Sequence, residues 1–249
     1  MSGLHDHPTS VLVDHPASSL PGDAFETLLA LADDELIIGH RHSEWLGLSP
    51  FLEEDLTLSS IAQDEFGHAR AMYALIWPAW EDREAGVTRR PAHQWRSCGL
   101  VELAGHPWER SLVRHFLYDL AEPLRWTSAL DRFGHVADLA NLVPTVLAEE
   151  RFHARHATDL VVRLGSDRDG ATRLQPHLDE LAPLAAGMMN GEPTKVVDQY
   201  VRAIGDVLPA LLHFMLPTAT PGRNHRSPEF ETIQEALVSV VAFDPTADW

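Results

Sequence analysis

Apolar residues recur three and four positions apart along most of this chain, which is the spacing that gives an α-helix one buried face. The pattern starts at Phe25, and Pro50 and Pro78 interrupt it, since the residue before a proline disfavours the helical conformation. Almost no segment alternates polar and apolar residues beside a hairpin turn, so strands are not expected. The predicted helices are 25–47, 53–76, 107–133, 143–165, 172–189, 193–215 and 228–241, with a short helix at 95–103 inside the connection 82–109.

The chain divides into an arm and a helical part. Residues 1–22 mix Pro, Ser, Gly and His without periodicity, and we expect a flexible N-terminal arm there. Residues 23–249 are expected to form one domain, because the glycines within 165–170 mark a loop between two helices rather than a domain boundary. The predicted fold class is an all-α bundle.

Charge and composition narrow the function. The 249 residues carry 19 Lys and Arg against 37 Asp and Glu, a net charge of −18, which argues against a nucleic-acid or membrane-surface partner. The lone cysteine, Cys98, excludes an intramolecular disulfide and a multi-cysteine metal site. No apolar run approaches the ~20 residues of a membrane span, and no signal peptide is recognisable, so a cytoplasmic protein is expected.

Two predicted helices contain the pattern Glu-x-x-His, with Glu65 and His68 in one and Glu150 and His153 in the other. In a helix each pair lies on one face, one turn apart, where carboxylate and imidazole can reach one metal ion. Burying them costs several kcal/mol unless their charge is compensated. The alternative is a structural network of Glu–His hydrogen bonds. The positions stacked with these pairs are apolar: Leu58, Ile61, Met72 and Leu75, and Val143, Val146, Ala157, Leu160 and Leu164.

A dinuclear metal centre in a four-helix bundle needs a further carboxylate from each of the other two helices. Glu35 is predicted for the first helix, because it shares a face with apolar residues and lies twelve residues before Gly47, as Glu65 lies twelve residues after Glu53. On the 107–133 helix we prefer Asp119, where Pro123 predicts a kink, and keep Glu122 as the alternative.

The predicted metal ligands therefore combine four carboxylates and two imidazoles without a thiolate, which suits a pair of iron ions, or of manganese ions. Four carboxylates also balance the charge of two divalent cations. Asp64 and Glu149 directly precede the ligand glutamates; they either orient the imidazoles of neighbouring helices or are plain surface acids. The predicted ligands are Glu35, Glu65, His68, Asp119, Glu150 and His153.

Residues 35–47 and 61–69, together with the Glu-Glu-x-x-His segment at 149–153, resemble the α-type subunits of bacterial phenylacetyl-CoA epoxidase. The resemblance covers nearly the whole chain after the arm. It implies a ferritin-like four-helix bundle with additional C-terminal helices. That complex has a catalytic di-iron subunit and a shorter structural one. This chain resembles the shorter subunit in length and C-terminal end, but it matches the catalytic ligand pattern at the six positions named above.

The resemblance also implies an activity and partners. Two iron ions would activate O2, and one oxygen atom would be added across an aromatic ring bond of a CoA thioester in phenylacetate catabolism. Other epoxidase subunits would join in a homo- or hetero-oligomer, and a separate reductase would deliver electrons, since the chain has no flavin or iron–sulfur motif. An anionic CoA thioester needs cationic contacts, for which Arg110, Arg114 and Arg125 are candidates.

Two other functions remain open at this stage. A non-catalytic scaffold subunit of the same complex would hold no metal. A ferroxidase or other metal-binding bundle would oxidise iron without an organic substrate, although the helices after Leu164 fit a heteromeric partner surface better than a compact storage subunit.

Overall fold

A computed structural model describes residues 18–136, 138–218 and 220–243, and every regular element in these ranges is a helix. The all-α prediction is thereby confirmed. Within the described part of the chain, no helix combines the length and the apolar character needed to cross a bilayer. The elements are α1 (Gly22–Ser43), α2 (Leu52–Ile76), α3 (Trp80–Thr88), the 3-10 helix η1 (Ala92–Gln94), α4 (Gly99–Glu102), α5 (Trp108–Asp119), α6 (Glu122–Phe133), α7 (Leu139–Gly165), α8 (Arg168–Met188), α9 (Thr194–Val207) and α10 (Phe230–Phe243).

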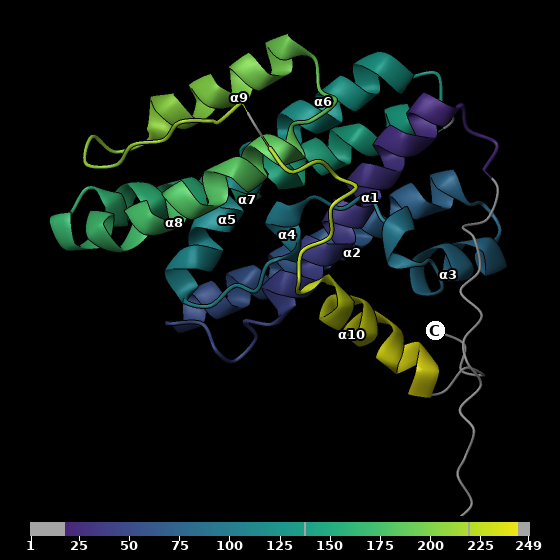
Figure 1. The fold of residues 1–249 in the computed structure, drawn as a ribbon, viewed down its shortest axis with the longest axis horizontal. Coiled ribbons are helices and arrows are strands. Elements are labelled where there is room, and N and C mark those ends of the chain that lie inside the picture. The colour runs from purple at the N-terminus through teal and green to yellow at the C-terminus, as the bar shows by residue number, and fades with distance from the viewer. Residues whose placement is uncertain (1–17, 137, 219, 244–249) are drawn as a thin grey trace, which may run out of the picture.

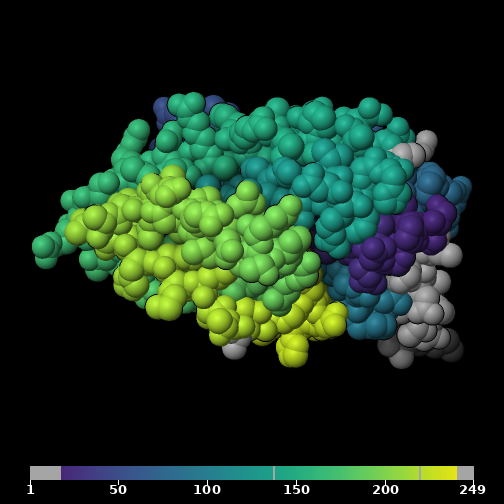
Figure 2. Space-filling view, turned by 90° about the horizontal axis from the view of Figure 1, so that it is seen from above, coloured from purple at the N-terminus to yellow at the C-terminus, as the bar shows by residue number. Residues whose placement is uncertain are grey.

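Four long rods form a ferritin-like bundle with extra helices around it (Figure 1). The rods are α1, α2, the consecutive pair α5 and α6, and α7. Of the additional helices, α4 packs on α1, α8 on α5, and α9 on α6, while α10 lies near α3. In the space-filling view, α9 covers one side of the molecule and the beginning of α1 is exposed at one end (Figure 2).

The helix predicted over 107–133 is two helices, and the break coincides with the two candidate carboxylates. Helix α5 ends at Asp119 and α6 begins at Glu122. Pro123 stands in the first turn of α6, where it has no N–H to donate to the carbonyl of Asp119. The predicted kink is therefore a full interruption, and Asp119 and Glu122 belong to different helices.

Other boundaries also differ from the sequence prediction. The helix expected over 193–215 ends at Val207, because Leu208 precedes Pro209 and adopts an extended conformation. The helix expected at 95–103 is reduced to α4, and α3 was missed because its mostly polar sequence shows little apolar periodicity. Helix α7 begins at Leu139, one turn before the predicted start at Val143. The predicted flexible arm mostly falls outside the described residues.

The buried apolar side chains form two clusters with a polar layer between them. One cluster joins the first half of α1, the end of α2, α6 and the beginning of α7. The other joins the later part of α1 with α4, α5, the second half of α7, α8 and α9. Leu36 packs against both clusters. All six predicted ligands lie along the chain at the level where one cluster gives way to the other.

Gly39 lets α1 and α2 approach closely beside this layer. A Cβ atom at this position would lie 3.1 Å from the Cβ of Glu65 and 3.1 Å from the ring of Phe66. A side chain there would push α1 away from Glu65, and therefore disturb the level at which the polar residues meet.

We expect Gly39→Leu to lower the free energy of unfolding by about 1–3 kcal/mol, because the added atoms overpack the α1–α2 contact. Urea unfolding followed by far-UV circular dichroism measures this change. Gly205→Leu is the matched control, since Gly205 is a helical glycine and a Cβ placed on it would meet nothing within 4 Å. That variant should gain a few tenths of a kcal/mol from helix propensity.

Candidate metal centre

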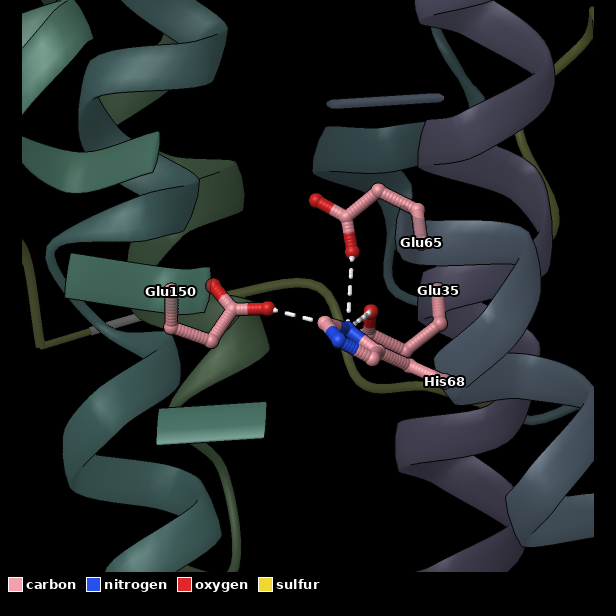
Figure 3. Close-up of side chains that lie close together, drawn as sticks. All are labelled: Glu35, Glu65, His68 and Glu150. Carbon is pink, nitrogen blue, oxygen red and sulfur yellow. Dashed lines mark hydrogen bonds and ion pairs between the residues drawn. The ribbon is translucent and has the colours of Figure 1, made fainter. Parts of the chain in front are cut away.

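Four predicted ligands converge in the polar layer. Glu35 on α1, Glu65 and His68 on α2, and Glu150 on α7 each place one ligand atom within 4.8 Å of the others. Figure 3 shows the three carboxylates directed toward the imidazole of His68. Its Nδ1 lies 3.1 Å from Glu35 Oε2, 3.5 Å from Glu65 Oε2 and 3.2 Å from Glu150 Oε1. All four side chains are buried, so the group is an internal polar site.

His153 joins the same group from α7. Its Nδ1 lies 3.5 Å from Glu65 Oε1 and 3.7 Å from Glu150 Oε2. Glu65 and Glu150 therefore each direct one oxygen toward His68 and the other toward His153. The two imidazole rings are 6.3 Å apart between their centroids. This arrangement provides two neighbouring positions for cations, each next to one imidazole and both next to the same two carboxylates.

The remaining two carboxylates of this region lie on opposite sides. Glu122 is close to Glu35, whose charge bears on its pKa, and it forms an ion pair with Arg125. Asp119 lies outside the group of four, in an ion pair with His115, but the charges of His153 and Glu150 bear on its pKa. The structure therefore gathers five of the six predicted ligands and places Asp119 on the His153 side.

Asp64 and Glu149 contact the outer nitrogens of the two imidazoles across the bundle. Glu149 on α7 has Oε2 2.8 Å from His68 Nε2 on α2. Asp64 on α2 has Oδ2 3.3 Å from His153 Nε2 on α7. Of the two interpretations left open by the sequence, the structure selects orientation of the imidazoles. Carboxylates at Nε2 direct Nδ1 of both rings inward.

Glu35 is fixed by donors from the end of α5 and from α6. Its Oε1 accepts hydrogen bonds from Tyr118 Oη at 3.1 Å and from Trp126 Nε1 at 3.4 Å. Its Oε2 faces His68, so the two oxygens have separate partners. The Tyr118 and Trp126 contacts hold this carboxylate in place whether or not a cation is bound.

Burial and like charge make this group electrostatically costly. Burial, followed by repulsion from Glu65, raises the pKa of Glu35 well above its usual value. Burial likewise raises the pKa of Asp119 and of Glu122. Glu150 is the exception: burial opposes its ionisation, but hydrogen bonds from His153 and His68 lower its pKa to about 2. The oxygens of Glu65 and Glu150 and Nδ1 of His153 are buried without a well-aligned hydrogen bond. Unpartnered oxygen and imidazole donors of this kind fit divalent cations.

Comparison with known proteins agrees with this arrangement. Residues 14–212 match the family described as phenylacetic acid catabolic protein. The chain belongs to this family. A relative in Escherichia coli (strain K12), one of the subunits of 1,2-phenylacetyl-CoA epoxidase, is 26% identical over 167 residues. That match covers 66% of this chain and 66% of the relative, slightly under two thirds of each.

In this member of the phenylacetic acid catabolic protein family, three further histidines extend from Asp119 toward the α1–α2 turn. The rings of His42 and His115 are 4.8 Å apart, and those of His115 and His156 are 5.7 Å apart. His156 Nε2 lies 2.8 Å from Glu54 Oε2. The sequence analysis did not group these residues. Helical spacing was the available signal, since His42 lies two turns after Glu35 and His156 lies one turn after His153.

The arginines considered for a CoA thioester are already engaged within the chain. Arg125 is 2% exposed and pairs with Asp34 and Glu122, and Arg114 is 1% exposed. Arg110 forms an ion pair with Glu180. Arg114 and Arg125 therefore do not present a guanidinium group to an external ligand.

The buried histidines predict a pH effect on stability. Burial, followed by the charges of His115 and Arg114, keeps the pKa of His42 well below 6.5. In the unfolded chain this histidine gains a proton as the pH falls below about 6.5, whereas in the folded chain it stays neutral. We expect His42 alone to cost about 2 kcal/mol of stability at pH 5 relative to pH 6.5 and above.

Urea unfolding of His42→Gln and the parent at about pH 5 and about pH 8 measures this effect. The variant should lose less stability between the two pH values, whatever its absolute stability. His213→Gln is the matched control, because the His213 side chain is 77% exposed, and it should keep the parent's difference. An equal loss in His42→Gln and the parent would contradict the assignment of a neutral, buried His42.

Proposed function

We propose that this protein is a metal-loaded subunit of a multicomponent monooxygenase of the phenylacetyl-CoA epoxidase type, acting in aerobic phenylacetate catabolism. One observation carries the proposal: Glu65 and Glu150 each direct one oxygen toward His68 and one toward His153, and those oxygens are buried without well-aligned hydrogen bonds. A scaffold has no need of buried, unpartnered carboxylates, whose cost is several kcal/mol.

The residues divide naturally around two iron ions, for which manganese offers the same preference for oxygen and imidazole. Glu35 and His68 would hold one ion, Asp119 and His153 the other, and Glu65 and Glu150 both. Glu122, paired with Arg125, is the alternative to Asp119. Four carboxylates balance two divalent cations, which removes the repulsion that now raises the pKa of Glu35. When bound, a pair of ferrous ions supplies the redox chemistry that activates O2.

The chain's own contribution is to orient the ligands and exclude water. Glu149 and Asp64 orient the imidazoles, and Tyr118 and Trp126 hold Glu35. The two apolar clusters shield the centre from solvent on both sides. The chain lacks a flavin or iron–sulfur motif, so electrons would come from a separate reductase. Other epoxidase subunits would complete the complex and contribute to binding the CoA thioester, since Arg114 and Arg125 are engaged internally.

A non-catalytic scaffold subunit of the same complex is the second candidate. The observation that favours it is the set of ion pairs that His68 already makes with Glu35, Glu149 and Glu150, which lets the group close without a cation. The two candidates differ in metal content, which can be measured directly.

We expect elemental analysis of the purified protein to find about two Fe or Mn ions per chain. Glu65→Ala and His153→Ala should lose most of this metal, because each removes a donor that serves the centre. Glu53→Ala, an exposed acid at the start of α2, is the control and should keep it. A metal-free protein whose thermal unfolding is unchanged by Glu65→Ala and His153→Ala would favour the scaffold.

Turnover then tests the chemistry. Together with partner subunits and a reductase, the protein should support O2-dependent epoxidation of phenylacetyl-CoA, and Asp119→Ala should reduce the rate by at least about a hundredfold if that carboxylate holds a cation. Mass spectrometry of the CoA product and O2 consumption measure it. Oxidation of added Fe²⁺ that proceeds without any CoA thioester being converted would indicate a ferroxidase instead.

A further inference from the structure

The candidate centre is closed to solvent except along the line where α2 and α7 face each other. Glu35, Glu65, Asp119, Glu150 and His153 are fully buried, and His68 is 3% exposed. On three other rods, α4, α8 and α9 lie over α1, α5 and α6. The line between α2 and α7, called the α2–α7 seam below, is where polar side chains connect the centre with the outside.

Two half-exposed carboxylates occupy this seam. The side chain of Asp64 is 33% exposed and that of Glu149 is 39% exposed. Each contacts the outer nitrogen of an imidazole whose inner nitrogen faces the buried carboxylates Glu65 and Glu150. The wall between solvent and centre is therefore one imidazole ring thick at each of these two points.

The outer surface of the seam is open. Gly67, one turn after Asp64 on α2, is exposed, and no atom outside its own helix neighbourhood lies within 4 Å of the place where a Cβ would stand. On α7, Phe152 is 54% exposed beside the buried His153. Among the described residues, none lies over position 67, so an ion in solution can approach Asp64 and Glu149 directly.

We propose that divalent cations reach the centre through the α2–α7 seam, and that Asp64 and Glu149 are the carboxylates they meet first. Carboxylate oxygens are the donors that hydrated divalent cations accept most readily. Two negative charges at the mouth of a low-dielectric wall also raise the local cation concentration and the association rate. This inference rests on the proposed function, because it presumes that the centre binds metal.

The decisive test changes the charge of the seam without altering any contact of the imidazoles. Gly67→Lys and Gly67→Glu place opposite charges one helical turn from Asp64, in open space. Metal-free protein is mixed with Co²⁺ in a stopped-flow instrument, and uptake is followed by quenching of tryptophan fluorescence. Trp126 is a built-in reporter, since its ring centroid is 6.0 Å from that of His68.

At low ionic strength we expect Gly67→Lys to slow Co²⁺ association, and Gly67→Glu to accelerate it, each by about threefold or more. The rates should converge toward the parent's at high salt. The matched controls are Gly205→Lys and Gly205→Glu on α9, another helical glycine with open space around it, and both should associate at the parent's rate. Equal rates for both Gly67 variants and the parent would overturn the proposal.

A second pair of variants separates access from orientation. Asp64→Asn and Glu149→Gln keep the shape of the side chains and remove their charge. Access through the seam requires slower Co²⁺ association, by about fivefold or more in the double variant. Faster dissociation into a chelator at an unchanged association rate would mean that both acids only orient the imidazoles, and would overturn the proposal.

Failure of the proposed function gives a different result. If the parent protein takes up no Co²⁺ at equilibrium, the metal centre itself is wrong. If the parent binds Co²⁺ but the Gly67 variants associate like the parent, the centre stands and the route through the seam is wrong.

Discussion

Carboxyl groups from three rods meet side by side in a core that excludes water, and the repulsion among them is the constraint on which this structure depends. Burial alone disfavours their ionised forms, and repulsion from Glu65 adds to this at Glu35. The imidazoles of His68 and His153 offset part of the cost from inside the group. The oxygens of Glu65 and Glu150 nevertheless remain without well-aligned hydrogen bonds. A centre built in this way favours positive charge in the space between the two rings.

The rest of the bundle can be understood as support for that layer. Gly39 brings α1 against α2 at the level of Glu65. The break between α5 and α6 directs one carboxylate toward each half of the group, with Asp119 on the side of His153 and Glu122 on the side of Glu35. Asp64 and Glu149 exchange contacts between α2 and α7, so each of these helices orients the histidine of the other.

Helical periodicity was enough to predict the all-α class, the two Glu-x-x-His pairs and the level of Glu35, because each follows from spacing along one helix or from equal distances around one short turn. The choice between Asp119 and Glu122 depends on how far Pro123 interrupts the rod, and no single-helix pattern gives that. The histidines at 42, 115 and 156 were overlooked for a related reason: they come from three different helices, and only packing brings them together. The arginines were misjudged because sequence alone does not show which charges are already paired inside the protein.

The division of the apolar interior into two clusters has a mechanical consequence. With Leu36 as a shared apolar contact, the two ends of the bundle adjoin across a plane of charged groups, which is the weakest joint in the molecule until something bridges it. Cations bound there would act as rivets, clamping α1, α2 and α7 to one another at mid-height. Loading would then stiffen both ends together, so that a single event at the middle of the molecule sets how firmly its outer surfaces are presented to neighbouring subunits.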